Sequence, residues 1–264
     1  MKIDMHCHTK EGSIDAKVSI EQYIKKLISN GFDGMLVTDH NSYDGYRKFK
    51  EIADRLHLDK PFAVLKGIEY DTRDAGHVIA ILPDHISETF LEIRGMTVVQ
   101  LERLVHAAGG ILGPAHPYGT GYFAFANTKF GRRNMEFIHK FDFIETFNAC
   151  TRPLANLKAD LMANRWKKPK IAGSDAHKEH IVGAAYTIFD SNIANNNDLI
   201  QAIRSGAETI ANGNILQKMC EKNNKVIEKL GVIGYWIYNK LGALLNHRKL
   251  KKVIHKQHFL NLDK

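Results

Sequence analysis

Histidine, aspartate and glutamate residues recur in this sequence directly beside short apolar segments. The residues that could do chemistry are His6, His8, Asp39, His40, Glu69, His77, His116, Asp175 and His177. Imidazole and carboxylate ligands suit zinc, manganese or iron, and no thiolate is needed. Because these candidates outnumber the four ligands of one tetrahedral site, the sequence predicts two or three divalent ions.

Bound ions of this kind would support hydrolysis. In two-metal hydrolases a carboxylate can bridge ions ~3.5–4 Å apart, and the pair activates water and clamps an in-line displacement. One HxH or DxH pair is a weak indication, because an isolated histidine is usually a surface residue or a hydrogen-bonded core residue. Here five segment ends carry a ligand type, and the two pairs lie at opposite ends of the body. We therefore interpret the set as one metal centre.

Alternating strand-like and helix-like segments must position these side chains. Strands are predicted at residues 2–5, 34–38, 62–69, 77–82, 110–115, 143–147, 170–173 and 186–189, the last being the final strand. Helices are predicted at 19–29, 43–56, 98–108, 155–164 and 197–205. This alternation predicts an α/β fold with a parallel sheet or barrel. In a β/α barrel the C-terminal strand ends converge at one mouth, so residues distant in sequence can meet there.

The basic excess of the chain lies in its last fifty residues. The 264 residues carry a formal net charge of +8; residues 215–264 hold 11 Lys/Arg and 3 Asp/Glu, and the preceding residues hold 26 of each. We therefore predict a body at 1–214 and a basic helical tail at 215–264. The apolar stretch 230–246 is expected to pack on the body or on a second subunit, and an interfacial membrane helix is the alternative. Weak contact with anionic lipid or RNA would act through the tail.

The first residues and the cysteines narrow the class of protein. The start, MKIDMHCHT, has no apolar h-region, and no run of 18 apolar residues occurs, so neither a secretory signal nor a spanning helix is expected. The three cysteines form no CxxC pair, so no thiolate zinc site is indicated. We expect a cytoplasmic enzyme without an obligate protein partner.

Five segments resemble the PHP (polymerase and histidinol phosphatase) superfamily, in particular its short stand-alone members. They are DMHCHT, VTDHNSYDG, GIEY with a downstream GHV, PAHP and AGSDAH, in the family's order from residue 1 to about 213. The resemblance implies a distorted, TIM-like (β/α)7 barrel that holds two or three zinc, manganese or iron ions.

The resemblance also implies which residues hold each ion. The first set comprises His6, His8, Glu69 and Asp175. The second comprises His77 and His116, with Glu69 as a bridge. The third comprises His40, His177 and one residue of the loop after the HxH pair, for which Asp15 is our choice and Glu11 the competitor. Glu69 and His177 are the expected catalytic residues, and Asp4, Asp39 and Glu145 either orient ligating histidines or cap strand ends.

The activity that the resemblance implies is hydrolysis of a phosphomonoester or phosphodiester, of a phosphorylated small molecule such as a nucleotide or of a nucleic-acid end such as RNA. Alternatives are a histidinol-phosphate or phosphotyrosine phosphatase, an amidohydrolase, and a non-catalytic metal-stabilised binding module. Candidate substrate contacts are Tyr118, Arg132, Arg133 and Arg152. Aromatic rings can stack on a base and an arginine can grip a phosphate, but these side chains could equally cover the barrel or be solvated.

Overall fold

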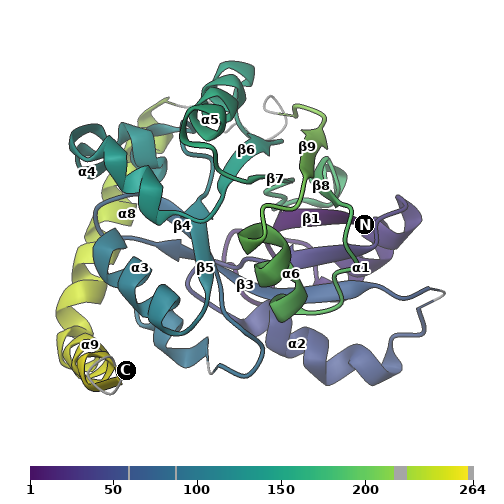
Figure 1. Cartoon of the computed structure of the whole chain (residues 1–264), viewed down its shortest axis with the longest axis horizontal. Helices are drawn as coiled ribbons and strands as arrows, with labels where there is room; N and C mark the ends of the chain where they lie inside the picture. The colour runs from purple at the N-terminus through teal and green to yellow at the C-terminus, as the bar shows by residue number, and fades with distance from the viewer. Residues whose placement is uncertain (59, 87, 217–224, 261–264) are drawn as a thin grey trace.

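A curled sheet of seven strands forms the centre of the structure, a computed structural model that describes residues 1–58, 60–86, 88–216 and 225–260. The strand order is β5-β4-β3-β2-β1-β8-β9, and β6 pairs with β7 in a second sheet (Figure 1). The strands are β1 (Lys2–Cys7), β2 (Gly34–Val37), β3 (Ala63–Asp71), β4 (His77–Ile81), β5 (Ile111–Pro114), β6 (Ile144–Asn148), β7 (Lys170–Gly173), β8 (Ala185–Phe189) and β9 (Thr209–Gly213). Because β5 lies beside β6, and β7 beside β1, β8 and β9, the sheets together approach a closed barrel. The expected distorted TIM-like barrel is confirmed.

The expectation of a parallel sheet is only partly correct. β2 runs parallel to β1 and β3, and β6 runs parallel to β7. The pairs β3–β4, β4–β5, β1–β8 and β8–β9 are antiparallel. Buried strands of either direction have the same apolar pattern, so the sequence did not reveal this. The sequence also missed β9, whose residues alternate between half-buried and exposed and form no long apolar run.

Five helices of the body lie where helical spacing predicts them, with ends shifted by up to four residues. They are α1 (Ile20–Ser29), α2 (Asp44–Ile52), α3 (Val98–Ala107), α5 (Pro153–Trp166) and α6 (Asn196–Arg204); α4 (Lys129–Arg133) is a further short helix. Ser19 and Thr97 cap α1 and α3 through capping boxes with Gln22 and Gln100. These side chains pair with backbone groups that the first helical turn leaves free, which sets where each helix begins.

Strand β1 separates an apolar cluster from the polar interior. Its side chains alternate between two faces. Ile3 and Met5 are fully buried in a cluster with apolar residues of β2, β3, β4 and α6. Asp4 and His6 are equally buried but contact polar side chains. The alternation therefore directs His6, and His8 two residues later, toward the other candidate ligands.

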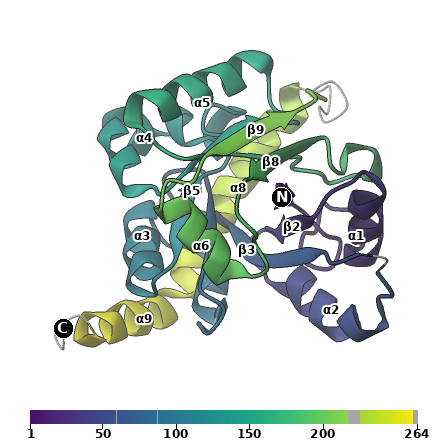
Figure 2. The ribbon, with the colours of Figure 1, turned by 45° about the vertical axis from the view of Figure 1, so that its right-hand side comes forward.

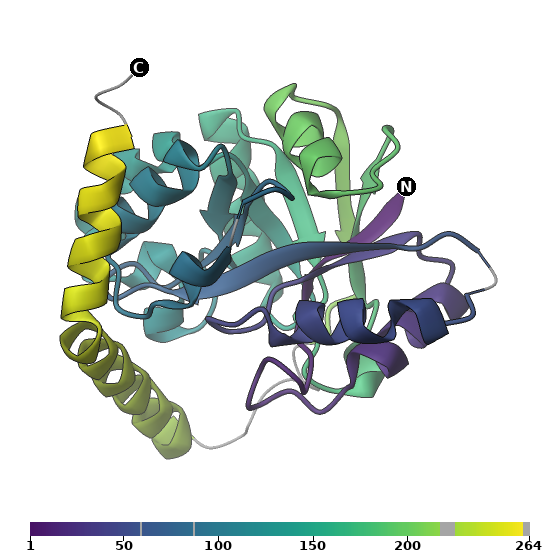
Figure 3. The same cartoon turned by 90° about the horizontal axis from the view of Figure 1, so that it is seen from below.

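Two further helices, α8 (Lys225–Leu245) and α9 (His247–Leu260), run along one side of the body, as Figure 2 and Figure 3 show. Leu250 of α9 is buried in the same apolar cluster as Leu101 and Val105 of α3. The division into body and tail stays a prediction, because residues 217–224 and 261–264 lie outside the described part. Among the described ranges, no helix combines the length and apolar character needed to cross a membrane.

Candidate metal centre

The ends of several strands bring the candidate ligands to one place. His40, three residues after the end of β2, forms an isolated bridge with Glu69 of β3. His77 is the first residue of β4, and because β4 runs antiparallel to β3 it pairs with Asp71 at the same end of the sheet. The remaining candidates end or follow β1, β5 and β7: His6, His8, His116, Asp175 and His177. Convergence at one site therefore does not require a fully parallel barrel.

The most complete group of ligand atoms comes from His6, His8, Glu69 and Asp175. The Nε2 atoms of His6 and His8 are 3.0 Å apart, and Glu69 Oε2 lies 3.4 and 3.3 Å from them. Asp175 Oδ1 lies 3.6 Å from His6 Nε2 and 3.2 Å from His8 Nε2. A tetrahedral ion with bonds of ~2.0–2.1 Å keeps its ligand atoms roughly 3.3 Å apart. The group therefore has the spacing of a single ion site.

A second group forms around the other oxygen of Glu69. Glu69 Oε1 lies 2.9 Å from His77 Nδ1 and 3.1 Å from His116 Nε2. The side chain of Glu69 is only 1% exposed. Its two oxygens thus face two different sets of imidazoles, which is the geometry of a bridging carboxylate.

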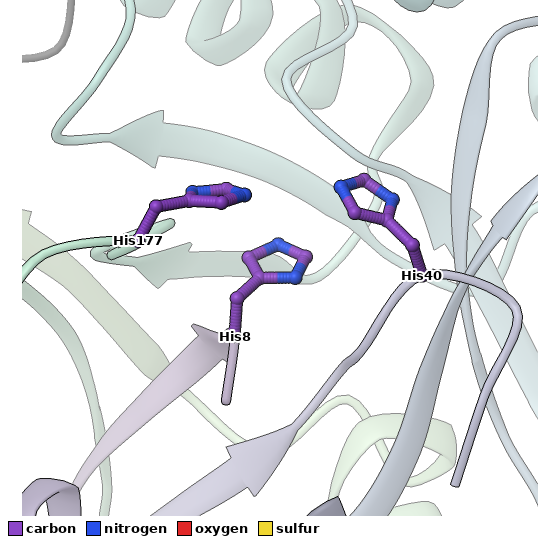
Figure 4. A group of neighbouring side chains, drawn as sticks. All are labelled: His8, His40 and His177. Atoms are coloured by element: carbon purple, nitrogen blue, oxygen red, sulfur yellow. The ribbon is translucent and has the colours of Figure 1, made fainter. Parts of the chain in front are cut away.

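A third group lies toward the solvent. His8, His40 and His177 point toward one another (Figure 4), and their ligand atoms lie within 4.8 Å of one another. Asp15 Oδ2 is 3.2 Å from His177 Nε2. Glu11 instead accepts a hydrogen bond from the backbone N–H that begins α1. The geometry therefore favours Asp15 over Glu11 as the loop residue of this group.

Glu145 accepts hydrogen bonds from two of the candidate histidine ligands. Its Oε1 accepts a hydrogen bond from His6 Nδ1 at 2.9 Å, and its Oε2 accepts one from the backbone N–H of His116 at 2.6 Å. The first bond places the ring proton of His6 on Nδ1, so Nε2 faces the first group with its lone pair. The structure thus favours the orienting role for Glu145.

Asp39 and Asp4 accept hydrogen bonds from different kinds of donor. Asp39 accepts from the Ser13 hydroxyl at 2.9 Å, and Ser13 Oγ lies 3.1 Å from Nδ1 of His8. Asp4 accepts from backbone N–H groups, including that of Ser174 at 2.9 Å, and burial raises its pKa to about 6. Asp39 therefore acts on an imidazole through one hydroxyl, whereas Asp4 joins two strand ends. Sequence reasoning did not find Ser13.

The buried charges shift one another's pKa. Burial alone would raise the pKa of Glu69, but the imidazoles of His77, His6 and His40 outweigh it and hold the pKa well below its usual range. Burial alone would lower the pKa of His40, but Glu69 and Asp71 outweigh it and raise the pKa to about 10. Without an ion, these carboxylates therefore favour the protonated form of the His40 imidazole, and a divalent ion bound there must displace that proton.

The residues present fit divalent cations. Several buried ligand atoms make no hydrogen bond within the described part of the chain: His40 Nδ1, Glu69 Oε2, Asp71 Oδ1 and His177 Nε2. Buried polar atoms normally have a partner, and an ion would supply one here. His116 and Asp175 also have positive φ angles of 29° and 53°, a conformation that costs ~1–3 kcal/mol and is characteristic of functional sites.

Sequence reasoning missed Asp71. It lies two residues after Glu69 on β3, and this spacing alone places both carboxylates on one face of the strand. Phe123, whose ring centroid lies 5.1 Å from that of His77, also borders the centre.

The four candidate substrate contacts lie at exposed positions or against an apolar cluster. Arg132 and Arg133 are exposed in the last turn of α4, and Arg152 is exposed at the N-cap of α5. Tyr118 is half-buried and packs against an apolar cluster. Their role in substrate binding stays a prediction.

Known proteins resemble this chain over most of its length. A family model for the PHP domain matches residues 4–108, and a PHP-associated model matches residues 153–208. PsfC from Pseudomonas syringae PB-5123 is 18% identical, with a TM-score of 0.60 over 90% of this chain and 97% of that one. A two-domain protein from Bacteroides vulgatus, which contains a predicted PHP-like metal-dependent phosphoesterase, is 18% identical, with a TM-score of 0.59 over 81% of this chain and 65% of that one. No curated protein matches.

Endonuclease Q, in complex with a 27-mer duplex that has an abasic lesion at the active site, is 15% identical, with a TM-score of 0.52 over 81% of this chain and 58% of that one. At such identities the solved structures show the fold alone. The two family models match segments that contain the second half of β1 and all of β2, β3, β4 and β7, whose ends carry most of the candidate ligands. The chain therefore belongs to the PHP superfamily.

Proposed function

We propose that this protein is a metal-dependent phosphoesterase that hydrolyses a phosphomonoester or phosphodiester of a nucleotide or nucleic-acid end. The observation that carries the proposal is the position of Glu69, whose two oxygens face two separate imidazole groups. Bound divalent ions would lower the pKa of a coordinated water toward ~7 and neutralise charge on the phosphoryl oxygens. Membership of the PHP superfamily supports the hydrolase class.

The residues of the chain would hold the ions and set the side from which the ester approaches. His6 is fully buried, whereas the side chains of His40 and His177 are 23% and 26% exposed and that of Asp15 is 51% exposed. The ester would therefore approach from the side of His177. The Nδ1 of His177 donates to the carbonyl oxygen of Asp175 at 3.0 Å, which presents Nε2 to the reacting group beside Asp15.

The substrate class rests on indirect support. The duplex bound to Endonuclease Q favours a nucleic-acid substrate, and the exposed Arg132, Arg133 and Arg152 could contact further phosphates. Tyr118 could stack on a base. We also propose that residues 1–214 form the catalytic unit and that 215–264 are a separate tail.

A metal count combined with a substrate panel tests the proposal. The protein is purified without added metal, its ions are counted by plasma mass spectrometry, and turnover is measured with Zn²⁺, Mn²⁺ or Fe²⁺. The panel contains nucleoside bisphosphates, 5′-phosphorylated RNA, abasic duplex DNA, histidinol phosphate and phosphotyrosine peptide. Glu69→Gln should lose at least ~100-fold in turnover, since even partners behind a ligand cost 10–100-fold. Glu208→Gln, on an exposed carboxylate, is the control. Metal binding without any phosphoester turnover would refute the proposal.

A further inference from the structure

Asp71 completes a group of ligand atoms on the β3–β4 side of the centre. Its Oδ1 lies 3.3 Å from His40 Nδ1 and 3.4 Å from His77 Nε2. His40 Nδ1 also lies 3.2 Å from Glu69 Oε2. These separations match the roughly 3.3 Å between ligand atoms of a tetrahedral ion.

The distances from Asp71 to its neighbours distinguish a metal ligand from a carboxylate that only orients a histidine. Glu145 orients His6 through a hydrogen bond of 2.9 Å, the usual length for a charged pair. Asp71 keeps a longer separation from both imidazoles. Its other oxygen, Oδ2, accepts from Nδ2 of Asn41 at 2.6 Å, and Oδ1 of Asn41 accepts the backbone N–H of Asp71 at 3.0 Å. Asn41 therefore holds the carboxylate so that its buried Oδ1 faces the imidazoles.

We propose that Asp71 is a metal ligand, which together with His40 and His77 holds an ion on this side of the centre. The proposal rests on the proposed function and changes its ligand groups: His77 leaves the group with His116, and His40 leaves the group with His8 and His177. A neutral imidazole has one lone pair, so His77 can serve this ion through Nε2 or the Glu69–His116 group through Nδ1, but not both. The proposal therefore assigns the Nε2 of His77 to the ion beside Asp71.

A Zn²⁺-soaked crystal of the full chain tests the assignment directly. Anomalous scattering at the zinc edge should place an ion ~2.0–2.2 Å from Asp71 Oδ1, with His40 and His77 as further ligands. In equilibrium dialysis Asp71→Asn should bind one Zn²⁺ fewer per chain, Asp71→Glu should restore part of the loss, and Asp54→Asn, on an exposed carboxylate, should match the wild type. Zinc at the His6, His8 and Asp175 group alone would overturn this inference and leave the phosphoesterase proposal standing. No bound zinc anywhere would overturn both.

An independent observation concerns helix α8, in whose described part five large aliphatic side chains face solvent. They are 45–75% exposed and comprise Ile233, Ile237, Leu241, Leu244 and Leu245. At 3.6 residues per turn they fall within an arc of about 120°. Among the residues of α8 whose side chains the structure describes, those that meet the body are small or polar: Gly242 packs against Arg94, Ala243 lies against Gly95, and Asn239 is 2% exposed. A contiguous exposed apolar face of this kind marks an interaction site.

The charges that follow this apolar face select its partner. Arg248, Lys249, Lys251 and Lys252 are exposed in the first turns of α9, and residues 229–260 contain no aspartate or glutamate. Two copies of the chain joined symmetrically through this surface would bring like charges together. We propose that α8 and the start of α9 dock on an anionic lipid surface, with the apolar face in the acyl region and the cations among the headgroups.

Vesicle flotation tests the docking. The full chain should float with phosphatidylcholine vesicles that contain phosphatidylserine and not with phosphatidylcholine alone. The double variant Leu241→Glu with Leu244→Glu should lose this binding at least tenfold, keep its ion content, and keep turnover of a soluble phosphoester. Leu161→Glu, on the exposed face of α5, is the matched control. Failure to float, or a dimer in sedimentation that the double variant abolishes, would overturn the lipid assignment.

Discussion

Replacing Glu145 by glutamine would show whether the carboxylate behind His6 controls ion binding. Glutamine keeps the size of the side chain, and its amide oxygen can still accept the hydrogen bond from His6 Nδ1, but it carries no charge and its NH2 group cannot accept the backbone N–H of His116. Hydrogen bonds to a charged group contribute ~1.5–3 kcal/mol, against ~0.5–1.5 kcal/mol for a neutral pair. The difference of ~1–1.5 kcal/mol corresponds to about tenfold weaker affinity. We therefore expect Glu145→Gln to weaken the ion held by His6 at least tenfold.

Competition titration of Zn²⁺ against a chelator of known affinity measures this change. Glu136→Gln, on an exposed carboxylate shortly before the same strand, is the matched control and should bind as the wild type does. Thermal unfolding in excess chelator reports whether the variant folds. Glu145→Ala should lose more, because the buried N–H groups of His6 and His116 would each lack an acceptor at ~1–3 kcal/mol. Zinc affinity of a folded Glu145→Gln equal to that of the wild type would refute the orienting role.

Three further perturbations address the fold and the charges. Gly173→Ala would drive a Cβ into the backbone of His6 and should cost ~1–3 kcal/mol of stability as well as ion affinity, whereas Gly234→Ala has open space; equal Tm values would contradict this. A hydrogen bond to Asp142 raises the pKa of His106, so its stabilisation is complete below the unfolded value of ~6.5 and is lost as pH rises through the folded value. His106→Gln should therefore lower Tm more at about pH 5.5 than at about pH 9, and an equal loss at both would count against the ion pair. Because ions must displace imidazole protons, Zn²⁺ affinity should fall about tenfold for each unit by which the pH is lowered and for each proton displaced. A Zn²⁺ affinity that does not change with pH would exclude that competition.

The local sequence pattern predicted much of the fold and part of the metal centre. Helix starts were predictable because Ser19 and Thr97 bond their own first turns, which is an interaction within four residues. The HxH pair was predictable because strand alternation alone directs His6 and His8 to one face, and their Nε2 atoms meet at 3.0 Å. Asp71 was within reach of the same rule, since it follows Glu69 by two residues.

Strand direction and long-range contacts were decided only by the tertiary structure. An apolar strand has the same pattern whether it runs parallel or antiparallel, so the antiparallel pairing that sets His77 opposite Asp71 was not visible in the sequence. Asp15 and Glu11 are both acidic residues of one loop, and only the folded chain shows Glu11 at the start of α1 and Asp15 beside His177. The sequence by itself determined which ligand types the chain carries and which face each strand residue takes, because both depend on near neighbours. Which ligands share an ion depends on residues over a hundred positions apart, and their meeting is set by how the whole sheet curls and packs.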